Sequence, residues 1–86
     1  AAPDWVVEVL SDATRRRDQK DKFEDYQRYG VQEYWVMDPD SISQSQFFVL
    51  RSGKYEPFQP HNSIITSQVI TGFKVNLRTL AKSLLN

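Results

Sequence analysis

Two short apolar segments, separated by a polar stretch with helical character, constrain what this chain can fold into. Residues 5–10 (WVVEVL) and 33–37 (EYWVM) are rich in β-branched and aromatic side chains, which favours buried strands. Residues 16–29 carry Asp18 and Asp21 near their N-terminal end and are followed by Gly30, as expected of a helix. A strand, a helix and a second strand predict two parallel strands joined by a helical crossover.

The rest of the sequence predicts a hairpin, two further strands and a C-terminal helix. Residues 46–51 and 54–58 flank Ser52-Gly53, a typical hairpin turn. Short strands are predicted near residues 63–66 and 73–75, and a helix over residues 77–85 with Asn76 as its N-cap. Because the sequence has no internal repeat or linker-like segment, we expect one α/β (α+β) domain over residues 1–86.

The composition excludes several classes of protein. The 86 residues include no cysteine, which excludes disulfides and thiolate metal sites and predicts a cytoplasmic protein. No apolar run approaches the roughly 20 residues that cross a bilayer, so no membrane association is expected. The formal net charge is zero, divided into −4 over residues 1–40 and +4 over the rest. The chain therefore lacks the overall basic charge typical of proteins that coat nucleic acid.

Glu8 is the most unusual residue, because it places a carboxylate in the middle of an apolar strand. Alternation along the strand puts Trp5, Val7 and Val9 on one face and Glu8 on the other. An unpaired buried carboxylate is costly, so Glu8 needs a partner. Lys22 on the following helix is the candidate, and we expect the two charged groups within roughly 4 to 8 Å of each other, directly or through water. Two simpler interpretations stay open: a buried ion pair with no further role, or a Glu8 that faces solvent at the end of the sheet.

Several segments of the chain resemble the C-terminal half of the Uma-two family of bacterial proteins. The matching residues are 3–11 (PDWVVEVLS), 14–18 (TRRRD), Lys22, Tyr26 and 29–39 (YGVQEYWVMDP). The family has a restriction-endonuclease-like fold and is placed in the PD-(D/E)xK nuclease superfamily. The resemblance implies a restriction-endonuclease-like mixed sheet with flanking helices, truncated at the N-terminus, because family members are much longer than this chain.

The same resemblance implies the site residues. In the superfamily, strand carboxylates hold Mg²⁺, and a lysine two residues after one of them positions the attacking water. Glu8 matches that carboxylate, which implies a catalytic residue and a ligand for Mg²⁺ or Mn²⁺. Leu10 stands where the lysine would be, and Lys22 matches the lysine of those branches in which it has moved to the next helix. Tyr26 matches a family position that lines or supports the site.

Two further groups of residues each carry two interpretations. Asp4 lies on the same face as Glu8, but four residues along an extended strand span about 13 Å. Asp4 is therefore either a structural residue that opens the strand or a metal ligand. Arg15, Arg16 and Arg17 either contact nucleic-acid phosphate or form a solvated basic turn.

The favoured function is that of a Mg-dependent nuclease-like domain that hydrolyses DNA phosphodiesters. We expect its site to be incomplete in this chain, because the N-terminal half of the family carries a further metal-binding Asp. One alternative is a catalytically silent member that binds nucleic acid or a protein, and another is a small α/β domain in which Glu8 is purely structural. Missing strands would leave an apolar face bare, at Trp5, Val7 and Val9 or at Trp35. We therefore expect a homo-oligomer, or pairing with the N-terminal portion of the same protein.

Overall fold

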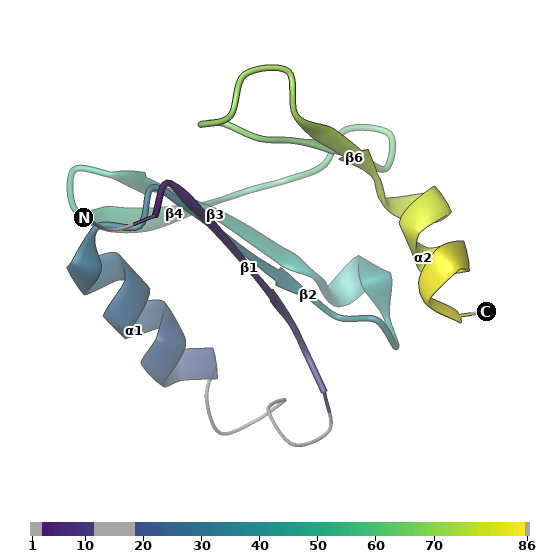
Figure 1. Cartoon of the computed structure of the whole chain (residues 1–86), viewed down its shortest axis with the longest axis horizontal. Coiled ribbons are helices and arrows are strands. Elements are labelled where there is room, and N and C mark those ends of the chain that lie inside the picture. Colours follow the sequence, from purple (N-terminus) through teal and green to yellow (C-terminus); the bar gives the residue numbers. More distant parts are fainter. Residues whose placement is uncertain (1–2, 12–18, 86) are drawn as a thin grey trace.

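A computed structural model describes residues 3–11 and 19–85 (Figure 1). The elements are, in order, β1 (Trp5–Val9), α1 (Gln19–Tyr29), β2 (Glu33–Met37), the 3-10 helix η1 (Ile42–Gln44), β3 (Gln46–Arg51), β4 (Lys54–Phe58), β5 (Ile64–Thr66), β6 (Lys74–Asn76) and α2 (Leu77–Leu85). The strand boundaries differ from those expected by at most one residue, and residues 16–18 of the expected helix lie outside the described residues. None of the helices in this part of the chain is long and apolar enough to cross a membrane.

Four strands form a mixed sheet in the order β1-β2-β3-β4. β1 and β2 run parallel, with Glu8 opposite Val36, which confirms the strand, helix and strand prediction. The pairs β2–β3 and β3–β4 are antiparallel. In the turn between β3 and β4, Ser52 and Gly53 have φ of 51° and 80°, and two positive φ values are typical of the tight hairpin turn that matches strand twist. β2 lies inside the sheet and is buried along its whole length.

The helix α1 covers one face of this sheet (Figure 1). Phe23 packs edge-on against Phe48, and Tyr26 packs against Tyr34, each pair with ring centroids 5.0 Å apart. The helix is followed by Gly30 with a φ of 82°. Glycine adopts this left-handed conformation with little strain, so the helix end predicted from the sequence is confirmed.

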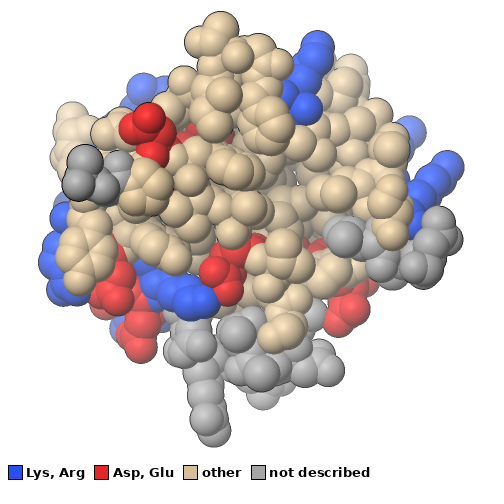
Figure 2. All heavy atoms as spheres, in the orientation of Figure 1, with Lys and Arg blue, Asp and Glu red and all other residues tan. Residues whose placement is uncertain are grey.

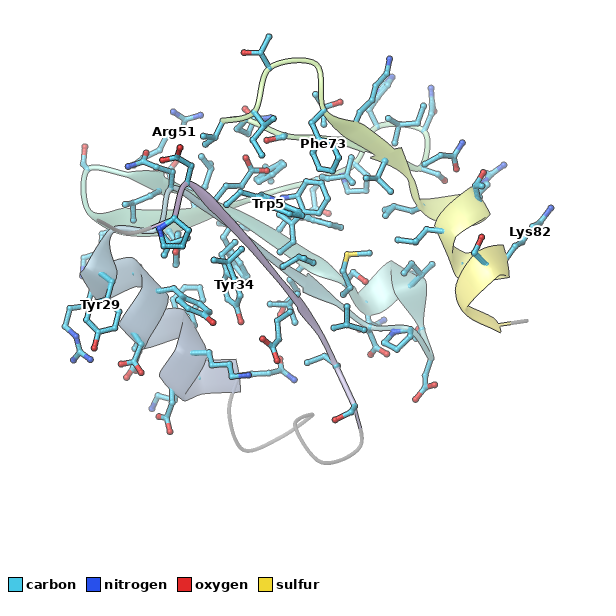
Figure 3. The ribbon with its side chains drawn as sticks, in the orientation of Figure 1. Trp5, Tyr29, Tyr34, Arg51, Phe73 and Lys82 are labelled. Carbon is cyan, nitrogen blue, oxygen red and sulfur yellow. The ribbon has the colours of Figure 1, made fainter. Side chains whose placement is uncertain are left out.

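The second sheet, β5–β6, and α2 lie on the opposite side of the main sheet from α1 (Figure 1). On this side Trp5 stands edge-on to both Trp35 and Phe73, with ring centroids 5.3 and 5.5 Å apart (Figure 3). The side-chain oxygen of Asn76 accepts two backbone N–H bonds from the first turn of α2, at 3.0 and 3.2 Å. Asn76 therefore caps this helix, as predicted.

The strand β1 lies at one edge of the main sheet. Val7 and Val9 are 38% and 54% exposed, and an apolar cavity of about 240 Å³ lies beside them, lined also by Trp5 and by residues of β6 and α2. Figure 2, in the orientation of Figure 1, shows a mainly uncharged face with Lys and Arg mostly at its margins. The bare apolar face expected at Trp5, Val7 and Val9 is present. Trp35, the other residue expected on a bare face, lies on this same face and also lines the cavity, but its ring packs against those of Trp5, Phe47 and Phe73 and is 2% exposed.

Candidate active site

Glu8 and Lys22 form a direct ion pair between β1 and α1. Glu8 faces the helix because successive residues of β1 point to opposite sides of the sheet. Lys22 is the fourth residue of α1. Lys22 Nζ donates a hydrogen bond of 2.6 Å to Glu8 Oε1. The prediction that these two groups lie together is confirmed, and the contact is direct rather than through water.

The ion pair is only partly shielded from solvent. The side chains of Glu8 and Lys22 are 21% and 32% exposed. Glu8 therefore does not simply face solvent at the end of the sheet, which was one interpretation, whereas an ion pair with no further role, which was the other, agrees with this contact. Water or a substrate group can reach the pair, while partial burial strengthens the attraction between the two charges relative to bulk water.

Tyr26 and Tyr34 lie beside this ion pair. Tyr26 is one helical turn beyond Lys22, and its ring meets that of Tyr34. Burial raises the pKa of Tyr34 well above its ordinary value, and the Glu8 carboxylate raises it further. Burial also raises the pKa of Tyr55 to about 12. The Tyr34 and Tyr55 hydroxyls therefore stay protonated at neutral pH and act as hydrogen-bonding groups rather than nucleophiles.

The other predicted site residues stand apart from this contact or outside the structure. Asp4 precedes β1 and is exposed, and its backbone carbonyl accepts a 3.0 Å hydrogen bond from the amide of Glu33. That bond begins the pairing of β1 with β2, which suits a residue that opens the strand. Arg15, Arg16 and Arg17 lie outside the described residues.

The donor chemistry around Glu8 can be compared with that of a magnesium site. Within residues 3–11 and 19–85, no three His, Cys, Asp or Glu side chains group closely enough to hold a metal ion. Mg²⁺ is commonly held by one or two carboxylates together with water and substrate phosphate. Glu8 fits that pattern as one carboxylate ligand with hard oxygen donors.

Glu33 is a second carboxylate of the sheet, and no local sequence pattern marks it as a buried group. It is 0% exposed and lies on the side of β2 that faces away from α1, with Trp35. Glu33 Oε2 accepts the Trp35 Nε1–H bond at 2.6 Å, and Oε1 accepts bonds from the Ser67 hydroxyl and from the amides of Gln68 and Val69, at 2.7, 2.9 and 3.0 Å. These bonds tie the segment after β5 to β2. Glu33 is therefore occupied in holding the fold together.

The comparisons with known proteins agree with this fold. Residues 1–79 match the Uma-two family, whose description is "Putative restriction endonuclease". The structure is similar to the crystal structure of a "putative nuclease belonging to DUF820" from Anabaena variabilis ATCC 29413, with a TM-score of 0.68 and 24% sequence identity. The match covers 96% of this chain and 46% of that one, so this chain spans about half the length of its structural relative. No curated protein matches the chain. The family match spans most of the chain and the nuclease-like fold agrees with it, so the chain belongs to the Uma-two family.

Proposed function

We propose that Glu8 and Lys22 form part of a metal-dependent site that hydrolyses DNA phosphodiesters. The observation that carries this proposal is the 2.6 Å contact between a carboxylate and an ammonium group that remain partly exposed at the junction of β1 and α1. The family description and the nuclease-like fold support the same class of activity.

The two residues have different parts in the proposed chemistry. Glu8 would hold Mg²⁺ or Mn²⁺, which when bound neutralises charge that develops on the phosphodiester. Lys22 donates hydrogen bonds to a phosphate oxygen or to the attacking water, and its charge favours an anion near Glu8. Tyr26 packs beside Tyr34 and steadies the helix turn from which Lys22 projects. Asp4 would serve as a second ligand only if the strand start moves toward Glu8, and Arg15, Arg16 and Arg17 would contact phosphates of the DNA.

One observation favours the alternative of a catalytically silent member that binds nucleic acid or a protein. Glu8 Oε1 accepts a hydrogen bond of 2.6 Å from the Lys22 ammonium group, which compensates the charge of the carboxylate. A metal ion must compete with that contact, whereas a silent member would keep it unchanged.

Paramagnetic broadening by Mn²⁺ separates the two functions. We expect Mn²⁺ to broaden backbone NMR signals around Glu8, and the Glu8→Gln variant to lose that broadening. Glu56→Gln, which removes an exposed carboxylate on β4, is the matched control and should change nothing near β1. Cleavage of a DNA duplex in Mg²⁺ would then be measured for the chain joined to the N-terminal portion that supplies the further carboxylate, and for the Glu8→Gln and Lys22→Met variants of that protein. Broadening that survives Glu8→Gln contradicts the metal role, and cleavage that survives both variants contradicts the whole proposal.

We also propose that the outer edge of β1 pairs with a second copy of this chain. An edge strand presents backbone N–H and C=O groups that favour strand pairing. Val7 and Val9 are exposed on the apolar side of this edge, and the cavity beside them is lined by apolar atoms. Pairing two such edges would bring the two apolar faces into one surface.

A further inference from the structure

One surface of β6 and α2 carries only positive charge. Lys74 of β6 and Arg78 and Lys82 of α2 are exposed, and we refer to these three residues as the basic face. None of their charged groups has an ion-pair partner among residues 3–11 and 19–85. The sequence explains part of this, because residues 57–86 contain no Asp or Glu. The positive charge of the basic face is therefore not compensated by any described side chain.

The strand and helix periods place the three cations on one side. Val75 and Leu80 line the apolar cavity beside β1. Alternation along β6 turns Lys74 to the side opposite Val75. Arg78 and Lys82 lie four residues apart, about 6 Å along the helix axis, on the face of α2 opposite Leu80. Because β6 runs directly into α2, the basic face is one continuous surface turned away from the cavity.

The basic face is separate from the Glu8–Lys22 pair. In Figure 2, blue spheres without red ones lie along the upper right margin, where Figure 1 places β6 and α2. Lys82 projects outward from α2 in Figure 3. The sheet β5–β6 and α2 lie on the opposite side of the main sheet from α1, which carries Lys22. A ligand can therefore bind the basic face without touching the ion pair.

The side chains around the cations are small and polar. Thr66 is the register partner of Lys74 in the β5–β6 pairing, so the two side chains share a face. Thr79 and Ser83 follow the two cations of α2 directly in the sequence and lie beside them on the helix. Lys, Arg, Ser and Thr are residue types that contact the phosphates and sugars of nucleic acids. The composition of this surface therefore suits a phosphate backbone.

The basic face lacks the exposed apolar side chains that other anionic partners require. Among the described residues, the large apolar side chains that are exposed all belong to elements other than β6 and α2. A helix that lies on a membrane needs an apolar face to insert, and protein interfaces have an apolar centre that is depleted of lysine. A phosphate backbone is instead bound mainly by cations. The chemistry therefore favours a nucleic acid over anionic lipid or an acidic protein.

We propose that the basic face binds the phosphate backbone of DNA, at a surface separate from the Glu8–Lys22 pair. The inference rests on the proposed function, in which DNA is the substrate, and adds to it a contact that needs no metal ion. Lys74, Arg78 and Lys82 each neutralise one phosphate and release its condensed counterions. Because phosphates carry no sequence information, this contact does not depend on the base sequence.

Fluorescence anisotropy with a labelled DNA duplex tests the inference on the 86-residue chain, in EDTA so that no cleavage occurs. The basic-face variant combines Lys74→Gln, Arg78→Gln and Lys82→Gln. A charge-matched control removes three exposed cations of α1, β3 and β4 by Arg28→Gln, Arg51→Gln and Lys54→Gln. Since each phosphate contact contributes about 0.9 to the slope of log affinity against log salt concentration, we expect that slope to fall by about 2 to 3 in the basic-face variant. The slope should stay unchanged in the control.

A third variant separates the effect of charge from that of folding. Lys74→Arg, Arg78→Lys and Lys82→Arg together keep all three charges, so this variant should bind the duplex like the unchanged chain. An equal fall of the slope in the basic-face variant and in the control would overturn the inference, and so would an unchanged chain that does not bind the duplex. Tighter binding of polyglutamate, or of phosphatidylserine vesicles, than of the duplex would also overturn it.

The binding test is independent of the proposed hydrolysis. Duplex binding that depends on the basic face and persists in Glu8→Gln would support the inference, even if the longer protein does not cleave DNA. Cleavage that requires Glu8, together with duplex binding that is the same in the basic-face variant and in the unchanged chain, would contradict this inference and leave the proposed function standing.

Discussion

The hydrogen bonds of Glu33 allow us to predict how its substitution changes the free energy of unfolding. Glu33→Ala removes the acceptor of four donors, two of which, Trp35 Nε1–H and the Gln68 amide, have no other acceptor within residues 3–11 and 19–85. Val69 keeps a 3.2 Å contact with the Ser67 hydroxyl, and the Ser67 hydroxyl can turn toward another acceptor. Each buried donor left without a partner costs about 1–3 kcal/mol. Since removal of the buried charge offsets part of that cost, we expect Glu33→Ala to lower the free energy of unfolding by about 3 kcal/mol.

The conservative variant separates hydrogen bonding from charge. Glu33→Gln keeps an oxygen that can accept hydrogen bonds from the Ser67 hydroxyl and from the backbone amides of Gln68 and Val69. Its NH₂ group would then lie opposite the Trp35 Nε1–H, and two donors cannot form a hydrogen bond with each other. The expected loss is about 1–2 kcal/mol for that single mismatch. Urea denaturation followed by tryptophan fluorescence measures all these values, and Glu56→Gln, an exposed glutamate on β4, is the control, with an expected change below about 0.5 kcal/mol. If Glu33→Ala and Glu33→Gln both fall within the change of the control, the network does not stabilise the fold and the reasoning is refuted.

Three further predictions concern the ion pair, alkaline pH and the edge of the sheet. A double-mutant cycle with Glu8→Gln and Lys22→Met should give a coupling energy of about 1 kcal/mol, a value between those of exposed and of buried ion pairs. A coupling energy of zero would mean that the contact does not persist in solution. Because the raised pKa values of Tyr34 and Tyr55 keep both hydroxyls protonated in the folded state, the chain should lose on the order of 2 kcal/mol of stability as pH rises from about 10 to about 12, measured by urea denaturation at each pH; constant stability over that range would contradict their burial. Val9→Lys should shift the chain from dimer to monomer in sedimentation without loss of secondary structure, and a native chain that already sediments as a monomer would rule out pairing at β1.

The order of the elements and the candidate site followed largely from local sequence patterns. β-branched and aromatic runs indicated β1 and β2, Gly30 indicated the end of α1, and Ser52-Gly53 indicated the hairpin. Alternation along β1 placed Glu8 on the helix side, and the apolar stripe of α1 turned Lys22 toward it. Both inferences need only the strand and helix periods, and for that reason the Glu8–Lys22 contact could be predicted.

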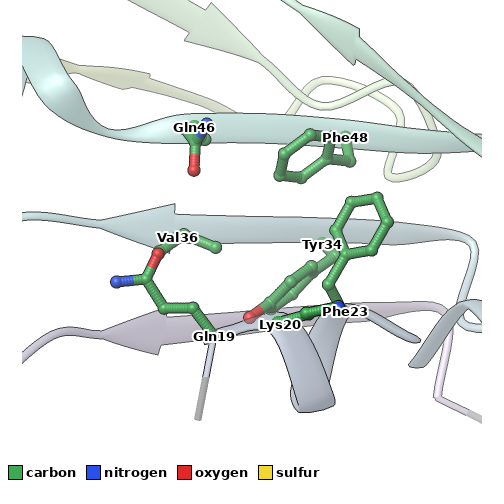
Figure 4. Close-up of a pocket in the computed structure, with 7 residues that line it drawn as sticks. All are labelled: Gln19, Lys20, Phe23, Tyr34, Val36, Gln46 and Phe48. Carbon is green, nitrogen blue, oxygen red and sulfur yellow. The ribbon is translucent and has the colours of Figure 1, made fainter. Parts of the chain in front are cut away.

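Contacts between distant segments were decided by the tertiary structure alone. Glu33 is satisfied by a segment that starts 34 residues later in the sequence, and no local pattern shows that this segment returns to β2. The cavity of about 290 Å³ between α1, β2 and β3 (Figure 4) requires β3 to lie next to β2, because Gln46 and Phe48 of β3 form part of its wall. Trp35 and Val9 lie on the same face of the sheet, yet only Trp35 is buried, because neighbouring strands flank β2 on both sides and β1 on one. Sequence period determines which face a side chain takes, whereas burial depends on what the rest of the chain places over that face.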